Sequence, residues 1–202
     1  VLVDEYDVCG GGIITTYSPT TKEDKLRDEV RTRDFNWIKS DIKPEERAYR
    51  NGHRAVLILI TGEPLSGKGP LARTLEYSLF QNNFQSYLLD RRNVNLGVSA
   101  DLSESTVEDE SARRLGEVAK LFLDAGHVVI STSNAFHKED QEDLRLLANP
   151  YQVIEIQVAS QPIGEPDIIL SQDEAQDAKT VSTKIQDFLK KKKILMGHNY
   201  SI

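Results

Sequence analysis

The sequence is poor in several features that would mark whole classes of protein. Cys9 is its only cysteine, so neither an internal disulfide nor a cysteine-based zinc site can form within it. No apolar run approaches the roughly 20 residues that span a bilayer, and no signal-peptide pattern opens the sequence. Basic charge is not in excess, since the net charge is −7, which argues against general binding to nucleic acid or anionic membranes. We therefore expect a soluble, cytoplasmic protein without nucleic-acid or membrane partners.

The sequence does contain a regular alternation of apolar strands and helical patterns. Strands are predicted at 56–60, 86–90, 127–133, 153–158 and 167–170. Helices are predicted at 44–49, 105–125, 138–148 and from 171 to about 193, with capping boxes of Ser105 with Glu108 and of Ser171 with Glu174. This alternation predicts an α/β fold with a parallel, doubly wound sheet of about five strands, and with residues 56–60 at its centre.

A glycine-containing turn follows the strand at 56–60. Gly62 is followed by four residues and then by Gly67 and Lys68, which is the spacing of a phosphate-binding loop. Such a loop turns its backbone N–H groups, and the N-terminal end of the next helix, toward an anion. The pattern usually closes with Ser or Thr, whose hydroxyl binds Mg²⁺, but here that position is Gly69. The predicted nucleotide-binding residues are Gly62, Ser66, Gly67, Lys68 and Gly69; the alternative is a strand-to-helix turn without a ligand.

Several further segments resemble the adenylylsulfate (APS) kinase family. They are residues 36–54, 89–94, 113–126 and 128–136. Residues 1–14 resemble the last strands of a GTP-binding sulfate adenylyltransferase subunit, to which the kinase is fused in some bacteria. The resemblance implies a P-loop NTPase-like three-layer domain at 35–202 and a linker at 16–34. Residues 1–15 would then be a short N-terminal β segment, the tail of a GTPase-associated β-barrel domain.

The family transfers the γ-phosphate of ATP to the 3′-hydroxyl of APS and so makes PAPS. The resemblance therefore implies ATP as the bound nucleotide, and Asp90, Asn93 and Arg113 as substrate-binding residues. It leaves the catalytic residues unassigned. No metal ligands are assigned either, because Gly69 lacks the hydroxyl that would hold Mg²⁺.

Other departures from the family pattern also bear on activity. Arg92 replaces an aspartate that would act as the base or organise the metal, and Asn95 replaces an arginine that holds APS. No Lys or Arg occurs between Arg92 and Arg113, so a further substrate arginine of the family is missing. Residues 159–167 span the place of the family's long basic lid and are too few to form one. Phosphoryl transfer depends mainly on positioning and charge stabilisation, so each loss should lower the rate.

Two functions remain open. The first is a degenerate APS-kinase-like domain, catalytically weak or inactive, that acts as the nucleotide-binding or scaffold module of a sulfate adenylyltransferase. The second is an active adenylylsulfate kinase that uses Lys68 on the phosphates of ATP. The departures favour the first. The expected partners are ATP or another nucleotide, and sulfate adenylyltransferase domains of the same chain or complex, with a homodimer as a further option.

Overall fold

The computed structural model describes residues 2–4, 7–10, 21–102, 107–134 and 138–197. The chain divides into two compact units, Val1–Trp37 and Ile38–Ile202. Among the described residues, every helix is too short or too polar to cross a membrane.

The larger unit is built on a parallel sheet of five strands in the order β4-β5-β3-β6-β7. The strands are β3 (Val56–Gly62), β4 (Ser86–Leu88), β5 (Val128–Ser133), β6 (Gln152–Val158) and β7 (Ile168–Leu170). β3 lies between β5 and β6 and is buried along its whole length, as a continuous apolar run is in a sheet covered on both faces. The predicted α/β fold, the five parallel strands and the central place of β3 are confirmed.

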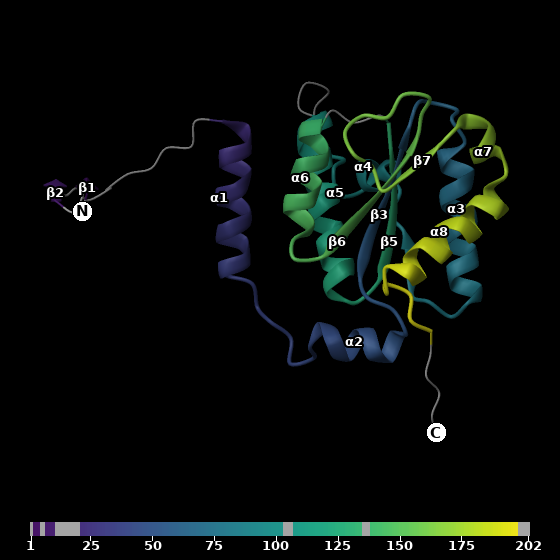
Figure 1. Ribbon diagram of the computed structural model, residues 1–202, viewed down its shortest axis with the longest axis horizontal. Helices are drawn as coiled ribbons and strands as arrows, with labels where there is room; N and C mark the ends of the chain where they lie inside the picture. Colours follow the sequence, from purple (N-terminus) through teal and green to yellow (C-terminus); the bar gives the residue numbers. More distant parts are fainter. Residues whose placement is uncertain (1, 5–6, 11–20, 103–106, 135–137, 198–202) are drawn as a thin grey trace. The chain divides into compact units, whose positions relative to one another are not determined.

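Helices cover both faces of this sheet, as Figure 1 shows. One face carries α3 (Lys68–Gln81), α7 (Gln172–Gln176) and α8 (Ala178–Lys191). The other face carries α4 (Arg91–Leu96), α5 (Val107–Asp124) and α6 (Lys138–Ala148). The short helix α2 (Pro44–Asn51) lies beyond the end of the sheet at which β3 begins (Figure 1). This is the predicted three-layer arrangement.

The side chains of β3 alternate between two apolar cores. Val56, Ile58 and Ile60 pack with residues of α3 and α8 on one face of the sheet. Leu57 and Leu59 pack with residues of α5 and α6 on the other face. The period of two is that of any strand, and here both faces are apolar because both are covered by helices. The carboxyl end of β3, where the phosphate-binding loop begins, is therefore held from both sides.

The C-terminal helical region differs from the single helix predicted from 171 to about 193. The capping box of Ser171 with Glu174 is present and begins α7. The helix then breaks at Asp177, whose carboxylate accepts a hydrogen bond from the Thr180 N–H at 3.2 Å and caps α8. A short polar side chain that bonds the neighbouring backbone competes with the helix and starts a new one. The other predicted capping box, at residues 105 and 108, involves positions outside the described residues.

The smaller unit contains β1 (Leu2–Asp4), β2 (Asp7–Gly10) and α1 (Lys22–Phe35). β1 and β2 pair as an antiparallel ladder, and β2 ends at Gly10. The segment predicted as a linker contains α1, which begins with a capping box of Thr21 with Asp24. Its buried residues are Leu26 and Val30, too few to give a visible helical period. The domain boundaries at 15 and 34 stay predictions.

Candidate functional site

The phosphate-binding loop connects the central strand to the first helix of the sheet's covering layer. β3 ends at Gly62, and α3 begins at Lys68 directly after Gly67. Gly67 has a φ of 91°, in the left-handed region that favours glycine. A Cβ at Gly62 would lie 2.7 Å from the Ser66 Oγ and 2.9 Å from the Val158 carbonyl oxygen, so no side chain fits there. The glycines of the motif are thus required by the conformation and packing of this loop.

Lys68 points back over the loop that precedes it. Its Nζ donates hydrogen bonds to the carbonyl oxygens of Gly62 and Glu63, both at 2.9 Å. Partial burial lowers the pKa of Lys68, and the nearby Glu63 carboxylate opposes this change. Both hydrogen-bond acceptors are neutral, so the ammonium charge is not cancelled by a direct carboxylate contact. It remains available to an anion held by the loop.

Ser66 supplies an observation that tests whether a phosphate fits this loop. Its side chain is 1% exposed, and within the described parts of the chain its Oγ has no hydrogen-bond partner. A buried hydroxyl without a partner is costly, and a phosphate oxygen in the loop would supply one. The N-terminal end of α3 adds N–H groups and the positive end of the helix dipole. The residues present therefore fit the phosphates of a nucleotide.

The metal ion that normally accompanies such phosphates fits less well. Gly69 lies in the first turn of α3 and has no hydroxyl to offer Mg²⁺. A Cβ there would meet the Arg73 Nη1 at 3.7 Å, an ordinary contact, so the absence of a side chain is not imposed by packing. Pro70 also lies in this first turn, where a helix tolerates the missing N–H. The loop is built for an anion but lacks the usual magnesium ligand.

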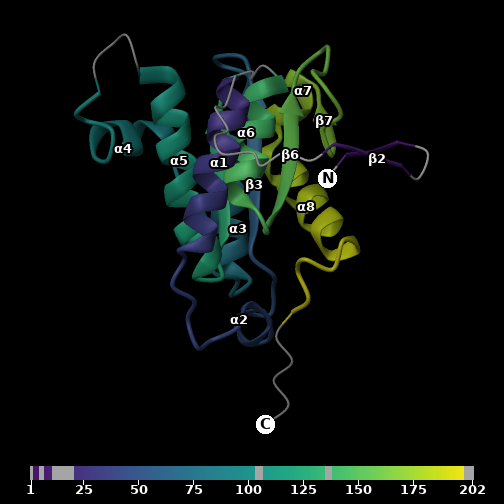
Figure 2. The ribbon, with the colours of Figure 1, turned by 90° about the vertical axis from the view of Figure 1, so that its left-hand side faces the viewer.

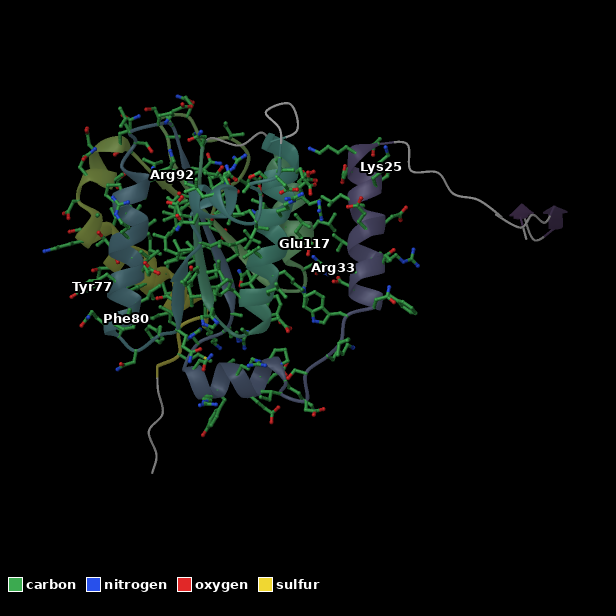
Figure 3. All side chains as sticks on the ribbon, turned by 180° about the vertical axis from the view of Figure 1, so that it is seen from behind. Lys25, Arg33, Tyr77, Phe80, Arg92 and Glu117 are labelled. Carbon is green, nitrogen blue, oxygen red and sulfur yellow. The ribbon has the colours of Figure 1, made fainter. Side chains whose placement is uncertain are left out.

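Asp90 lies just beyond the carboxyl end of β4 and caps the helix that follows. Its Oδ1 accepts a hydrogen bond of 2.8 Å from the Arg92 N–H. The Arg92 Nε lies 3.5 Å from the same oxygen, with the Arg92 side chain 84% exposed. Figure 3 shows Arg92 beside the carboxyl ends of the strands. Asn93 is exposed on α4. The Asp90 carboxylate therefore stabilises local structure, and substrate binding by Asp90 and Asn93 stays a prediction.

Arg113 and Arg114 are already bound to carboxylates. Arg113 makes two hydrogen bonds of 2.8 Å to the Glu110 carboxylate and lies 3.9 Å from Glu117. Arg114 donates to Glu110 at 2.9 Å and to Asp101 at 3.0 Å. The hydrogen bond from Arg113, with that from Arg114, lowers the pKa of Glu110 to about 2, and the hydrogen bond from Arg114 lowers the pKa of Asp101. Both positive charges are therefore neutralised within the protein.

The structure brings some of the predicted site residues together and separates others. The five predicted nucleotide-binding residues form one continuous turn at the end of β3. Asp90 follows β4, which is separated from β3 by β5, and Arg113 lies on α5. All the strands are parallel, so these elements meet the same carboxyl edge of the sheet, where ligands bind in such folds. Binding by each of these residues stays a prediction.

Ser133 is a candidate that the sequence did not reveal. It ends β5 and is the register partner of Thr61 on β3, which places it at the carboxyl edge beside the loop. Its side chain is buried, and its Oγ has no partner among the residues that the structure describes. Only its position at the end of a predicted strand pointed to it, and the order of the strands was needed to bring it next to β3.

The connection between β6 and β7 is short and tied to the sheet. The Gln157 side chain donates to the Ile163 carbonyl oxygen at 2.7 Å and accepts from the Ile163 N–H at 2.8 Å. The Asp167 carboxylate accepts from the Glu155 N–H at 3.1 Å. These bonds hold residues 159–167 close to β6, so this connection forms no long basic lid.

Comparison with known proteins gives a consistent set of relatives. The family model described as adenylylsulphate kinase matches residues 54–188. The adenylyl-sulfate kinase of Shewanella pealeana is 41% identical over 128 residues, which cover 63% of this chain and 62% of that protein. This chain thus spans less than two thirds of the length of that relative.

Solved structures show the same fold. A mutant APS kinase of Mycobacterium tuberculosis matches with a TM-score of 0.63 and 27% identity, over 68% of this chain and 99% of that one. The same enzyme in complex with AMPPNP and APS matches over the same shares with a TM-score of 0.61 and 22% identity, which supports the fold alone. Since the family model covers more than half of the sequence, the chain belongs to the adenylylsulphate kinase family.

Proposed function

We propose that this chain is an APS-kinase-like domain that binds a nucleotide but has lost most or all of its phosphotransferase activity. The observation that carries the proposal is a difference between the hydrogen-bond partners of Lys68 and those of Arg113 and Arg114. Among the described residues, Lys68 donates its hydrogen bonds to neutral carbonyl oxygens, whereas Arg113 and Arg114 are paired with carboxylates. A phosphate can therefore be attracted to the loop, while an anionic second substrate must compete with internal carboxylates for the arginines.

The size of the losses supports weak catalysis. A hydrogen bond to a charged group contributes roughly 1.5–3 kcal/mol. Two substrate arginines of the family have no counterpart here, which costs about 3–6 kcal/mol, or two to four decades in rate. The glycine at position 69 and the short 159–167 connection remove a metal ligand and a cover against water. These losses affect different parts of the reaction, so no single residue restores it.

The residues of the loop account for nucleotide binding without a metal. Bound ATP would supply the phosphate groups; the loop N–H groups and the positive end of α3 would hold them. Lys68 would neutralise part of their charge, and the Ser66 hydroxyl would donate a hydrogen bond. Neither role needs Mg²⁺, so we expect the dependence on the metal to be small.

The N-terminal β segment bears on the partner of this domain. Residues 1–14 resemble part of a GTP-binding sulfate adenylyltransferase subunit, and β1 and β2 form a hairpin there. We infer that the domain works beside sulfate adenylyltransferase domains, of the same chain or of a complex, as a nucleotide-binding or scaffold module. The short β segment and the segment at 16–34 would connect the two functions.

An active APS kinase is the second candidate. It is favoured by the identity of 41% to the Shewanella pealeana enzyme and by the intact glycine-lysine spacing of the loop. In that reaction the bond from the γ-phosphorus to the β–γ bridging oxygen breaks, the 3′-oxygen of APS bonds to phosphorus, and the hydroxyl proton leaves to a base. Arg92 stands where the family has a carboxylate for this proton.

One pair of measurements on the same protein preparation separates the two candidates. Calorimetry measures ATP binding, and a coupled assay measures PAPS formation from ATP and APS. Binding without turnover supports the degenerate module. Turnover at an ordinary rate supports the active kinase, and the loss of both overturns the nucleotide-binding role.

A further inference from the structure

The two edges of the sheet differ in what covers their outward-facing backbone groups. At the β4 edge, the Leu88 N–H faces away from β5 and donates a hydrogen bond of 2.7 Å to the Glu76 carboxylate of α3. The Ser86 hydroxyl donates to the Glu76 carbonyl oxygen at 3.3 Å. These contacts with α3 close the β4 edge to a further strand.

The β7 edge is open within the described part of the chain. The Ala159 N–H bonds to the Leu170 carbonyl oxygen at 3.0 Å, so the backbone groups of Leu170 face β6. Consecutive residues of a strand direct their backbone groups to opposite sides, so the N–H and C=O of Ile169 face away from the sheet. No described residue hydrogen-bonds to either group, and an unpaired edge of this kind accepts an extended peptide as an additional strand.

A groove lies between this open edge and α8. Figure 2 shows β7 and α8 next to each other, and the groove between them has a volume of about 780 Å³. Ile168, Ile169 and Phe188 form its apolar part, and the Ile169 side chain is 48% exposed. The groove therefore places open backbone hydrogen-bonding groups beside apolar side chains, the two features that strand addition uses.

The two aspartates that line the groove have partners within the chain. The Asp187 carboxylate lies 3.1 Å from the Nζ of Lys190, which does not line the groove. The Asp167 carboxylate accepts a hydrogen bond of 3.1 Å from the Glu155 N–H. Both carboxylates are therefore engaged without a ligand in the groove.

The two lysines that line the groove are available to a ligand. Lys191 has no ion pair among the described residues. Lys184 lies 3.4 Å from the Glu174 carboxylate, but this pair is exposed, and exposed pairs are weak. The basic run 190–193 adds positive charge at the same end of α8. The α8 side of the groove is therefore positive and complements an acidic segment.

We propose that the β7 edge binds an extended segment of a partner protein in which one apolar residue stands between two acidic residues. The segment would add to the sheet as a further strand, antiparallel to β7, with its apolar residue directly opposite Ile169. These two residues would exchange both backbone hydrogen bonds, so that the open N–H and C=O of Ile169 gain partners. The apolar side chain would lie on the same face of the sheet as that of Ile169 and cover it.

The same geometry brings the two acidic side chains to α8. Ile168 and Leu170 belong to the apolar core beneath α3 and α8, so their side chains point to that face of the sheet. The neighbours of the central apolar residue point the same way, because side chains alternate along a strand. These neighbours are about 7 Å apart, and Lys184 and Lys191 are about 10 Å apart along the helix. Long, flexible lysine side chains span this difference.

The charges of α8 disfavour a second copy of the chain at this edge. A two-fold pairing of two β7 strands would bring the lysine-bearing sides of two α8 helices together, and like charges that face each other repel. An acidic segment of another protein meets the same lysines with the opposite sign.

Fluorescence anisotropy with synthetic peptides and the full chain tests the proposal. The probe is a labelled heptapeptide, Gly-Thr-Glu-Val-Glu-Thr-Gly, for which we expect a dissociation constant of about 10–300 μM. A second peptide carries a methyl group on the backbone nitrogen of its central valine and so lacks one hydrogen-bond donor at the edge. It should bind at least about tenfold more weakly. A third peptide, with lysine in place of both glutamates, should not bind at concentrations below about 1 mM.

A charge reversal in the groove provides a matched pair of variants. Lys184→Glu with Lys191→Glu should weaken binding of the glutamate peptide at least about tenfold and should give the lysine peptide a measurable affinity. Lys179→Glu with Lys193→Glu is the control, because both lysines are exposed, lie outside the groove and change the net charge by the same amount. It should leave the binding nearly unchanged. Circular dichroism confirms that both double variants are folded.

Four outcomes would overturn the proposal. They are no binding of the glutamate peptide at about 1 mM chain, equal binding of the methylated peptide, equal losses in the two double variants, and a self-association of the chain that excludes the peptide. None of these measurements depends on nucleotide binding or on catalysis, so a failure here leaves the proposed function untouched.

Discussion

The phosphate-binding loop and the α4–α5 corner, residues 90–102 and 107–117, lie at the same edge of the same sheet but treat charge in opposite ways. In the loop, Lys68 is held by two neutral carbonyl oxygens. In the corner, Arg113 and Arg114 share the Glu110 carboxylate, and Arg114 also binds Asp101. The loop therefore keeps a positive charge without a direct carboxylate contact, whereas the arginines of the corner are held in internal ion pairs.

Our proposal that the domain binds a nucleotide but has lost phosphoryl transfer rests on this difference. Attraction of phosphates needs only N–H groups and one cation, and the loop provides both. Transfer also needs a second substrate to be held in line, and the nearby Arg113 and Arg114 are already paired with carboxylates. The ion pairs of Arg113 and Arg114 with Glu110 are partly exposed, so each contributes modestly to the stability of this corner.

The largest expected effect concerns transfer itself. We expect PAPS formation by the unmodified chain to be at least about a thousandfold below that of an ordinary family member. Gly69→Ser with Arg92→Asp should not restore it, since the substrate arginines and the lid are still missing. A serine fits at position 69, because its Cβ would meet the Arg73 Nη1 at 3.7 Å. The coupled assay measures this, with the Shewanella pealeana enzyme as the positive control. Ordinary turnover by the unmodified chain would refute the contrast between the two regions.

The second effect concerns the loop alone. Lys68→Ala should weaken ATP binding about tenfold to a hundredfold, because one charge-assisted hydrogen bond is lost. Removal of Mg²⁺ should change the affinity of the wild-type chain much less, since Gly69 offers no hydroxyl. Calorimetry with and without Mg²⁺ measures both effects, and Lys179→Ala on the surface of α8 is the control. A strong requirement for Mg²⁺ would reveal a metal ligand elsewhere in the site.

The positions of the loop and of the strands along the chain could be predicted from the sequence for a physical reason. Buried parallel strands are continuous apolar runs, and this pattern located β3 and β5, which are buried almost throughout. The residues of the loop are neighbours in sequence, so their shared location followed from one strand and one helix. Nothing comparable exists for α4, which has one turn and a half of mostly polar residues, or for the helix break at Asp177. At Asp177, one side-chain hydrogen bond to the Thr180 N–H determines that one helix ends and the next begins.

The charge state of the corner could be predicted only in part. Glu110 and Arg114 are four residues apart on one helix, a spacing at which pairing is expected. Asp101 lies in the segment before α5, outside any helical period, and its contact with Arg114 depends on how that segment folds. The sequence therefore listed Arg113 as a candidate for substrate binding, while the structure shows that its guanidinium is already occupied.

A third prediction tests this occupation through pH. The pKa of Glu110 is about 2 in the folded chain and 4.5 without its partners, so its stabilisation is complete above pH 4.5 and lost as pH falls toward 2. Glu110→Gln should cost about 1 kcal/mol at neutral pH, a modest value because the group is partly exposed. Urea unfolding at several pH values should show this difference shrinking below pH 4.5. Glu165→Gln, at an exposed glutamate, should show no such trend; a constant difference for Glu110→Gln would argue against the ion pairs.

The smallest expected effect is on the free energy of unfolding, and it concerns the backbone conformation of the phosphate-binding loop. Leu65 has a φ of 65° and a side chain that is 99% exposed, so it adopts a left-handed conformation without packing in return. Leu65→Gly should therefore stabilise the chain by about 0.5–1 kcal/mol, because glycine enters this region without steric penalty. Leu96→Gly is a matched control: this leucine is also exposed but lies in α4, where glycine should cost about 1 kcal/mol. Both substitutions loosen the unfolded chain equally, so opposite signs in urea unfolding would assign the difference to backbone conformation. Equal destabilisation by both would mean that the loop carries no strain at Leu65.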